Sequence, residues 1–126
     1  PYWTWGATAV LFLLIAWLSS VPAPPAEAEA RLSPAATRMA AAAGFDEVAA
    51  IVQGRCAMCH AAEPAWEGMI WPPKGVVLET PAEIATHARQ IYLQAGISHA
   101  MPPGNRSYME PEERAAIVRW FRGSAG

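Results

Sequence analysis

Charged residues are scarce in this chain of 126 residues. Asp, Glu, Lys and Arg make up 16% of it, and the net charge at pH 7 is −2. No run of basic residues stands out, so the electrostatic footprint of a nucleic-acid-binding protein is missing and this class of partner is excluded. Strand patterns are also lacking, because the short apolar run GVVLET at 75–80 has no second run with which to pair. An all-α fold is therefore predicted.

The first 26 residues contain no charged side chain. As a helix, residues 3–21 would be roughly 28 Å long, which is enough to cross the hydrocarbon core of a bilayer. Tryptophans lie near both ends of this segment, as in the aromatic belts of membrane helices. No basic segment precedes the apolar run, which favours a retained helix over a cleaved secretory signal. We predict a transmembrane helix at 1–21, and we expect a sequence that begins with Pro1 to be a processed chain or part of a longer one.

A linker is predicted at 22–43, because its prolines and alternating Ala and Glu leave little to bury. Within the linker, Ser33 and Pro34 suit the N-cap and the first position of a short helix. The folded domain is predicted to follow at 44–123.

Three helices are predicted in this domain. The first covers about 45–55 and has an apolar stripe at positions i, i+3, i+4 and i+7. The second, over 80–96, begins with a capping box and ends at a glycine, and the third, over 111–123, begins with proline among glutamates and also ends at a glycine.

The domain has too few apolar residues for an independent core. A domain of roughly 80 residues usually needs a disulfide, a metal or another staple. Its two long loops, 61–79 and 97–109, are rich in Trp, Met and Pro, and they are too long to be idle connections. We therefore expect a large apolar body to lie between them.

Cysteine occurs only twice, as Cys56 and Cys59 in the sequence CAMCH, which ends in His60. A disulfide here would close a tiny loop and contribute little stability. A thiol redox pair is expected beside a βαβ pattern, which is missing. A zinc site needs further ligands, and His87 and His99 have no partner at zinc-finger spacing. The favoured alternative is a covalent haem, for which C-x-x-C-H is the signature, with two thioethers to the vinyl groups and His60 on the iron.

A methionine is predicted to be the sixth ligand, because electron-transfer haems often have His and Met in the two axial positions. Met101 is favoured, since it lies in the loop sequence SHAMPPGN, where two prolines stiffen the backbone. The alternatives are Met109, Met69 and, for bis-His ligation, His99. Met58 lies inside the attachment turn and faces the wrong way.

Further residues are candidates for holding or tuning the haem. A metal-bound histidine usually donates its second ring N–H to a carbonyl or carboxylate. The predicted acceptors are the carbonyls of Pro64, Pro72 and Pro73. Two aromatic side chains either contact the haem, by packing on it or by a hydrogen bond to a propionate, or cover the edge of the core: Trp66 and Trp71. Three cations either neutralise haem propionates or lie at the surface, which is their default: Arg55, Lys74 and Arg106.

The segments RCAMCH, MPPGN and MEPEERAAIVRWF together resemble a class I monohaem cytochrome c, over about residues 45–123. The resemblance implies a cytochrome c fold of three to four helices around one covalent haem c. It implies that the first and last helices cross, with Phe45 to Val52 and Trp120–Phe121 at the contact. It also implies haem attachment outside the cytoplasm and hence a periplasmic domain, whereas Arg31 and Arg38 after the apolar helix weakly favour the cytoplasm.

A narrower resemblance is to the bacterial membrane urate oxidase (urate hydroxylase) family. The segments RCAMCHAAEPAW, PPKGVVLETPAEI and AMPPGNRSYMEPEERAAIVRWFRG, with the preceding apolar helix, are similar to the C-terminal end of these proteins. This resemblance implies an inner-membrane protein whose cytochrome domain passes electrons from a urate-oxidising membrane domain to a downstream cytochrome or terminal oxidase. No residue of this chain would itself catalyse urate oxidation.

Three other functions stay open. The first is a free-standing, membrane-anchored monohaem cytochrome c of a respiratory chain. The second is a haem sensor or peroxidase-like protein, which requires that Met101 leaves the iron open. The third is a zinc or structural module, which requires that no haem is attached.

Overall fold

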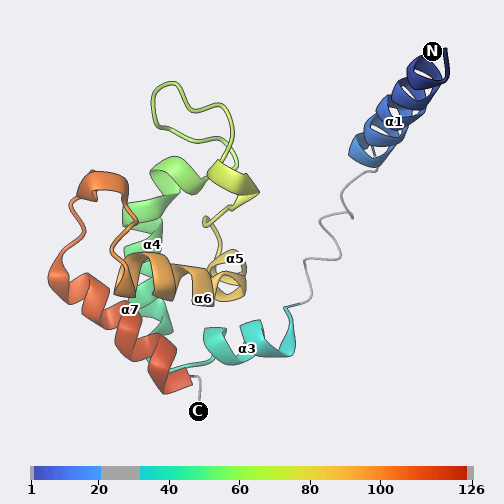
Figure 1. Ribbon diagram of the computed structural model, residues 1–126. Coiled ribbons are helices and arrows are strands. Elements are labelled where there is room, and N and C mark those ends of the chain that lie inside the picture. Colours follow the sequence, from blue (N-terminus) through green and yellow to red (C-terminus); the bar gives the residue numbers. More distant parts are fainter. Residues whose placement is uncertain (1, 21–31, 125–126) are drawn as a thin grey trace. The chain divides into compact units, whose positions relative to one another are not determined.

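The computed structural model describes residues 2–20 and 32–124, and its regular elements in these ranges are all helical. The chain divides into two compact units, 1–31 and 32–126. The first unit holds helix α1 (Tyr2–Ser20), and the second holds the other elements (Figure 1). The prediction of an all-α chain is confirmed for the described residues.

Helix α1 forms over 19 residues of the uncharged N-terminal segment. Its large apolar side chains are exposed. Within residues 2–20 and 32–124, however, no helix is both long enough and apolar enough to cross a membrane. The predicted transmembrane helix at 1–21 is therefore not confirmed.

Helix α3 (Pro34–Ala40) begins as the sequence predicts. Ser33 is its N-cap, and the Ser33 hydroxyl accepts a hydrogen bond from the amide of Ala36 at 3.1 Å. Ala36 is buried in the core, and Trp120 donates its indole N–H to the carbonyl of Met39 at 3.1 Å. Residues 34–40, which the sequence placed in the linker, thus pack into the second unit.

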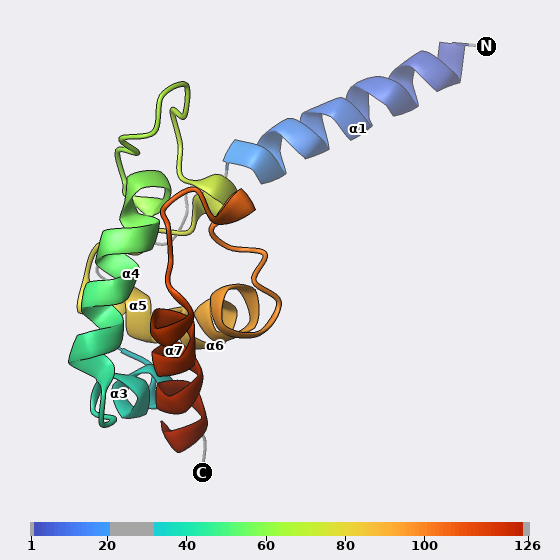
Figure 2. The same ribbon diagram turned by 90° about the vertical axis from the view of Figure 1, so that its left-hand side faces the viewer.

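Helices α4 (Phe45–His60) and α7 (Pro111–Ser124) pack against each other in the second unit (Figures 1 and 2). At their contact the ring centroids of Phe45 and Trp120 are 5.8 Å apart. Val48, Val52 and Ile117 are completely buried beside them. Each such side chain contributes about 1.5–3 kcal/mol by leaving water. The predicted contact between the first and last helices of the domain, with an aromatic at the contact, is confirmed.

Helix α4 is longer than the predicted 45–55. It continues to His60, so that CAMCH forms the last turn of a regular helix. Gly44 is the N-cap at φ 86°, a left-handed conformation that glycine adopts without strain. The consequence is that the two thiols and the imidazole are carried by a rigid element rather than by a loop.

The helix predicted over 80–96 is present but divided. Helix α5 (Pro81–Thr86) begins with the predicted capping box between Thr80 and Glu83. It is followed by α6 (Ala88–Ile91) and by the π-helix η2 (Tyr92–Ile97). The break lies at His87, whose φ and ψ are −95° and 15° and whose Nδ1 lies 2.9 Å from the carbonyl oxygen of Glu83.

Gly96 was predicted as a C-cap, and this prediction is wrong. Gly96 is buried inside η2 and does not have a positive φ. A Cβ at this position would lie 2.9 Å from Cγ2 of Val118 on α7. Glycine is therefore needed here because η2 approaches α7 closely, not because the helix ends.

Candidate functional site

The two cysteines and the histidine of CAMCH lie in the last turn of α4. Both thiols are free, and both cysteines are half-buried. Residues three apart share one side of a helix, so Cys56 and Cys59 can bond to one flat molecule. Burial raises the pKa of the Cys56 thiol from its usual 9.0 to about 11, and the neighbouring Cys59 adds to the rise. The thiol of Cys56 is thus neutral at physiological pH.

The imidazole of His60 is oriented by the carbonyl of Val76, which lies 2.9 Å from Nδ1. A carbonyl oxygen can only accept, so Nδ1 is the donor, and in the neutral ring Nε2 keeps a free lone pair. This is the tautomer that a metal-binding histidine needs. The predicted acceptors Pro64, Pro72 and Pro73 are wrong. The acceptor follows a 3₁₀ turn, η1 (Pro73–Gly75), that the sequence pattern did not predict.

Hydrogen bonds hold the end of loop 61–79 against α4 and against the first residues of the loop itself. The amide of Leu78 donates to the carbonyl of His60 at 2.7 Å. The Glu79 carboxylate accepts from the amide of Ala62 at 2.9 Å, and the Glu79 carbonyl accepts from the side chain of Gln53 at 2.8 Å. The loop therefore returns to the residue from which it started and holds the backbone of His60.

Met101 follows the π-helix η2 in the chain. Met101 is half-buried. Its amide donates to the carbonyl of Gln94 at 3.0 Å, and its carbonyl accepts from Arg114 at 2.9 Å. The backbone of Met101 is thus fixed through both of its polar groups.

The other methionine candidates have different surroundings. Met109 is buried in the hydrophobic core, where it has the gap-filling role that is common for methionine. Met69 is half-buried in loop 61–79, and Met58 is exposed on α4. His99 is exposed with φ at 55°.

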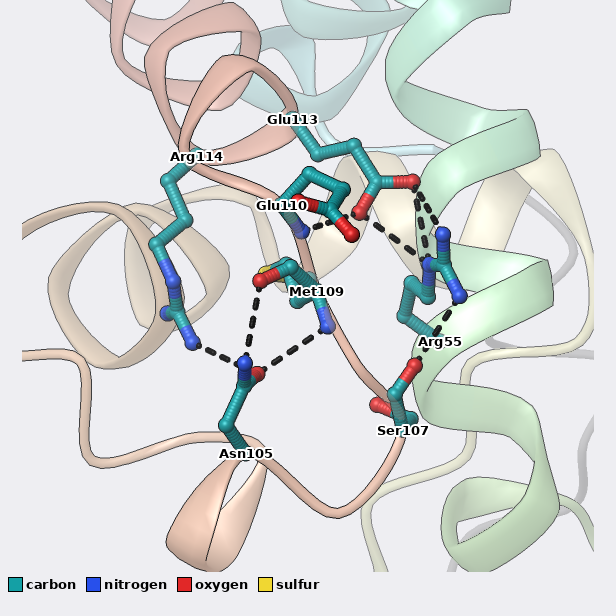
Figure 3. A network of polar contacts seen from close by, with 7 residues as sticks. All are labelled: Arg55, Asn105, Ser107, Met109, Glu110, Glu113 and Arg114. Atoms are coloured by element: carbon teal, nitrogen blue, oxygen red, sulfur yellow. Dashed lines mark hydrogen bonds and ion pairs between the residues drawn. The ribbon is translucent and has the colours of Figure 1, made fainter.

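A polar network holds the loop that follows Met101 (Figure 3). Asn105 bonds through its side chain to both the amide and the carbonyl of Met109, at 3.0 and 3.1 Å. Arg55 of α4 donates to the carbonyl of Ser107 at 2.9 Å and forms an ion pair with Glu113 of α7 at 3.0 Å. The loop is therefore tied to both of the crossing helices.

The predicted propionate-binding cations have separate positions. Arg55 is held in the network just described. Arg106 lies over the ring of Trp66, with 5.8 Å between the guanidinium carbon and the ring centroid, and this contact joins loop 61–79 to loop 97–109. Lys74 and Trp71 are exposed. Two open depressions of about 390 and 540 Å³ lie beside α7, and neither is lined by CAMCH residues.

One residue of this site, Arg114, was missed by sequence reasoning. It is buried and bonds to the carbonyl of Met101. A signal existed for it, because Arg114 lies three residues before the fully buried Ile117 and so falls on the apolar face of α7. Arg55 was named as a candidate cation with the surface as its default, and it bonds to Ser107 and Glu113 instead of lying free there.

The donor set can be tested against the candidate ligands. Within residues 2–20 and 32–124, no three His, Cys, Asp or Glu side chains are grouped to hold a metal ion, so zinc is not supported. Free thiols at i and i+3, followed at once by an imidazole with a free Nε2, fit a covalently attached haem. Residues 43–121 match the family model of cytochrome c oxidase, cbb3-type, subunit III.

The chain belongs to this family. Its cytochrome c domain carries a covalently attached haem c, and its chemistry is haem-based electron transfer, which requires redox partner proteins. Neither the curated proteins nor the solved structures contain a match to the chain. The cbb3-type model supports the resemblance to a monohaem cytochrome c, and the narrower resemblance to the urate oxidase family is not supported.

Proposed function

We propose that the second unit is a single-haem electron carrier in which Cys56 and Cys59 hold the haem and His60 and Met101 bind its iron. Each thiol adds across one vinyl group, so that a sulfur–carbon bond forms and the thiol hydrogen goes to the other vinyl carbon. No oxidant is needed for this step. When bound, the haem supplies an iron that accepts and releases one electron.

The contact that best supports this proposal is the hydrogen bond between His60 Nδ1 and the carbonyl of Val76. It fixes the ring plane and the tautomer. Met101 would supply the other iron ligand, and the two ligands together would leave no iron position for a substrate. A carrier with both positions filled transfers electrons without binding a substrate at the iron, which distinguishes it from a sensor or peroxidase-like protein.

The test of ligation uses Met101→Ala in protein matured in a host that attaches c-type haem. We expect the oxidised wild type to show the far-red methionine–iron charge-transfer band and Met101→Ala to lack it. Met58→Ala is the matched control, because Met58 is an exposed methionine of α4, and it should keep the band. A band that survives in Met101→Ala would overturn Met101 as the ligand. A wild-type spectrum typical of an open, high-spin iron would favour the sensor or peroxidase-like function.

We also propose a periplasmic location, because the class I cytochromes c that the sequence resembles receive their haem outside the cytoplasm. Fusion of a reporter that is active only in the periplasm to the C-terminus tests this location. No observation on the described residues favours a urate-oxidising donor or an anchor that spans the membrane. The electron donor and acceptor are accordingly proposed only as redox proteins.

A further inference from the structure

Arg114 is a buried cation at the centre of the Met101 region. Its relative exposure is 8%, and its guanidinium donates three hydrogen bonds. Nη1 donates to the carbonyls of Ala95 at 2.6 Å and Met101 at 2.9 Å, and Nη2 donates to Oδ1 of Asn105 at 3.2 Å. None of these acceptors is a carboxylate. Figure 3 shows the guanidinium directed at Asn105, away from the Arg55–Glu113 ion pair.

Burial of an arginine without a carboxylate partner is costly, because the charge loses its hydration. An aliphatic side chain would pack on this helix face without the free-energy cost of burying a charge. What the guanidinium offers instead is a planar fork of donors with fixed directions. The arrangement of its acceptors therefore indicates what the residue does.

The acceptors lie on both sides of one short stretch of chain. Ala95 is in η2, before the stretch, and Asn105 is in the 3₁₀ turn η3 (Pro103–Asn105), after it. Met101 lies between them. The fork thus sets the separation of the two ends of the stretch and the position of its middle residue at the same time.

Both polar groups of the Met101 backbone are hydrogen-bonded when Arg114 is in place. The amide is bonded to Gln94 and the carbonyl to Arg114. These bonds restrict the backbone before the sulfur binds a metal, which lowers the entropic cost of ligation.

We propose that Arg114 is a positioning residue for the sixth ligand, which acts by fixing the main chain of Met101. The inference rests on the proposed function, in which Met101 binds the haem iron. Without the fork, the stretch 96–105 opens more often and the methionine sulfur leaves the iron more often. An external ligand then binds the iron more readily, because its apparent affinity rises with the population of the open state.

The test compares Arg114→Met with Arg119→Met in the haem-bearing full chain. Arg119 is an exposed arginine of the same helix, so this variant controls for the loss of one positive charge. The probe is imidazole, titrated against the oxidised protein, and the far-red methionine–iron band is recorded in parallel. Loss of hydrogen bonds from a charged donor predicts imidazole binding at least about tenfold tighter in Arg114→Met. We expect a weaker band in Arg114→Met and wild-type values in Arg119→Met.

A second variant separates positioning from folding. Arg114→Lys keeps the charge and most of the length, but one ammonium cannot span three acceptors. We expect it to form holoprotein with an imidazole affinity between those of the wild type and Arg114→Met. Wild-type affinity and band in either folded variant overturn the proposal, and so does failure of both variants to form holoprotein, since Arg114 is then a folding residue.

The failure of this inference differs from the failure of the proposed function. If Met101→Ala keeps the far-red band, the ligand assignment is wrong and the inference falls with it. If Met101→Ala loses the band but Arg114→Met behaves as the wild type, Met101 remains the ligand and only the positioning role is rejected.

Discussion

The ring of His60 is oriented by a carbonyl sixteen residues later in the chain. The sequence alone proposes Cys56, Cys59 and His60 as the residues that hold the haem, because C-x-x-C-H requires only local spacing. The acceptor could not be predicted in this way, because it depends on the turn at Lys74 and Gly75, whose φ values are 57° and 69°. Glycine tolerates that conformation, whereas a lysine in it is uncommon. Spacing can therefore propose residues that bond to the cofactor, but it does not predict the carbonyl that orients His60.

Removal of one thiol tests the attachment at the scale of single residues. In Cys56→Ser we expect the haem to stay covalently bound through Cys59 alone, with one vinyl group left unsaturated. The remaining vinyl extends the conjugation of the ring, so the pyridine haemochrome band should move to longer wavelength. Mass spectrometry should still give the weight of the chain plus one haem. An unchanged band position would show that Cys56 does not form a thioether.

The helices of the second unit differ in how well local sequence signals predicted their bounds. The start of α5 was predicted from its capping box and the extent of α7 from its charge pattern and apolar face. The break at His87 and the π-helix η2 were not predicted, because neither arises from local propensity. The break and the π-helix occur where η2 packs against α7. Tertiary packing of this kind overrides the helical pattern that the sequence shows over 80–96.

The close approach of η2 to α7 predicts a specific sensitivity at Gly96. The new Cβ of Gly96→Ala would meet Val118 Cγ2 at 2.9 Å, so the helices must separate slightly or Val118 must change rotamer. We expect a loss of about 1–3 kcal/mol in the free energy of unfolding, measured by urea denaturation.

Gly54→Ala is the matched control for this variant. Gly54 lies within α4, is exposed, and has nothing within 4 Å of the position of a Cβ. The substitution should stabilise the domain by up to about 1 kcal/mol, because alanine has the higher helix propensity. Equal effects of the two substitutions would contradict the packing role of Gly96.

The second unit as a whole combines a small hydrophobic core with long loops. The fully buried large side chains are few: Ile84, Ile117, Val48 and Val52. A chain that cannot attach haem, Cys56→Ala/Cys59→Ala, should therefore unfold at a lower temperature and with less cooperativity than the holoprotein. We expect a deficit of about 3 kcal/mol or more, since a haem buries more apolar surface than one aromatic side chain. Circular dichroism melts check this, and equal stability of the two forms would show that the haem is not part of the core.

The His60 side and the Met101 side of the site are held by contacts that differ in their separation along the chain. The His60 side is held by residues that lie within about twenty positions of His60 in the sequence, largely through main-chain hydrogen bonds to the end of α4. The Met101 side depends on side chains that reach over from α4 and α7. Such a division makes the methionine side the first cooperative unit to open, at a free energy below that of global unfolding. Amide hydrogen exchange in the holoprotein should accordingly proceed faster over 98–109 than over the last turns of α4. Under mild denaturation, local opening of the Met101 side would then expose the iron while the thioether bonds and the histidine ligand remain in place.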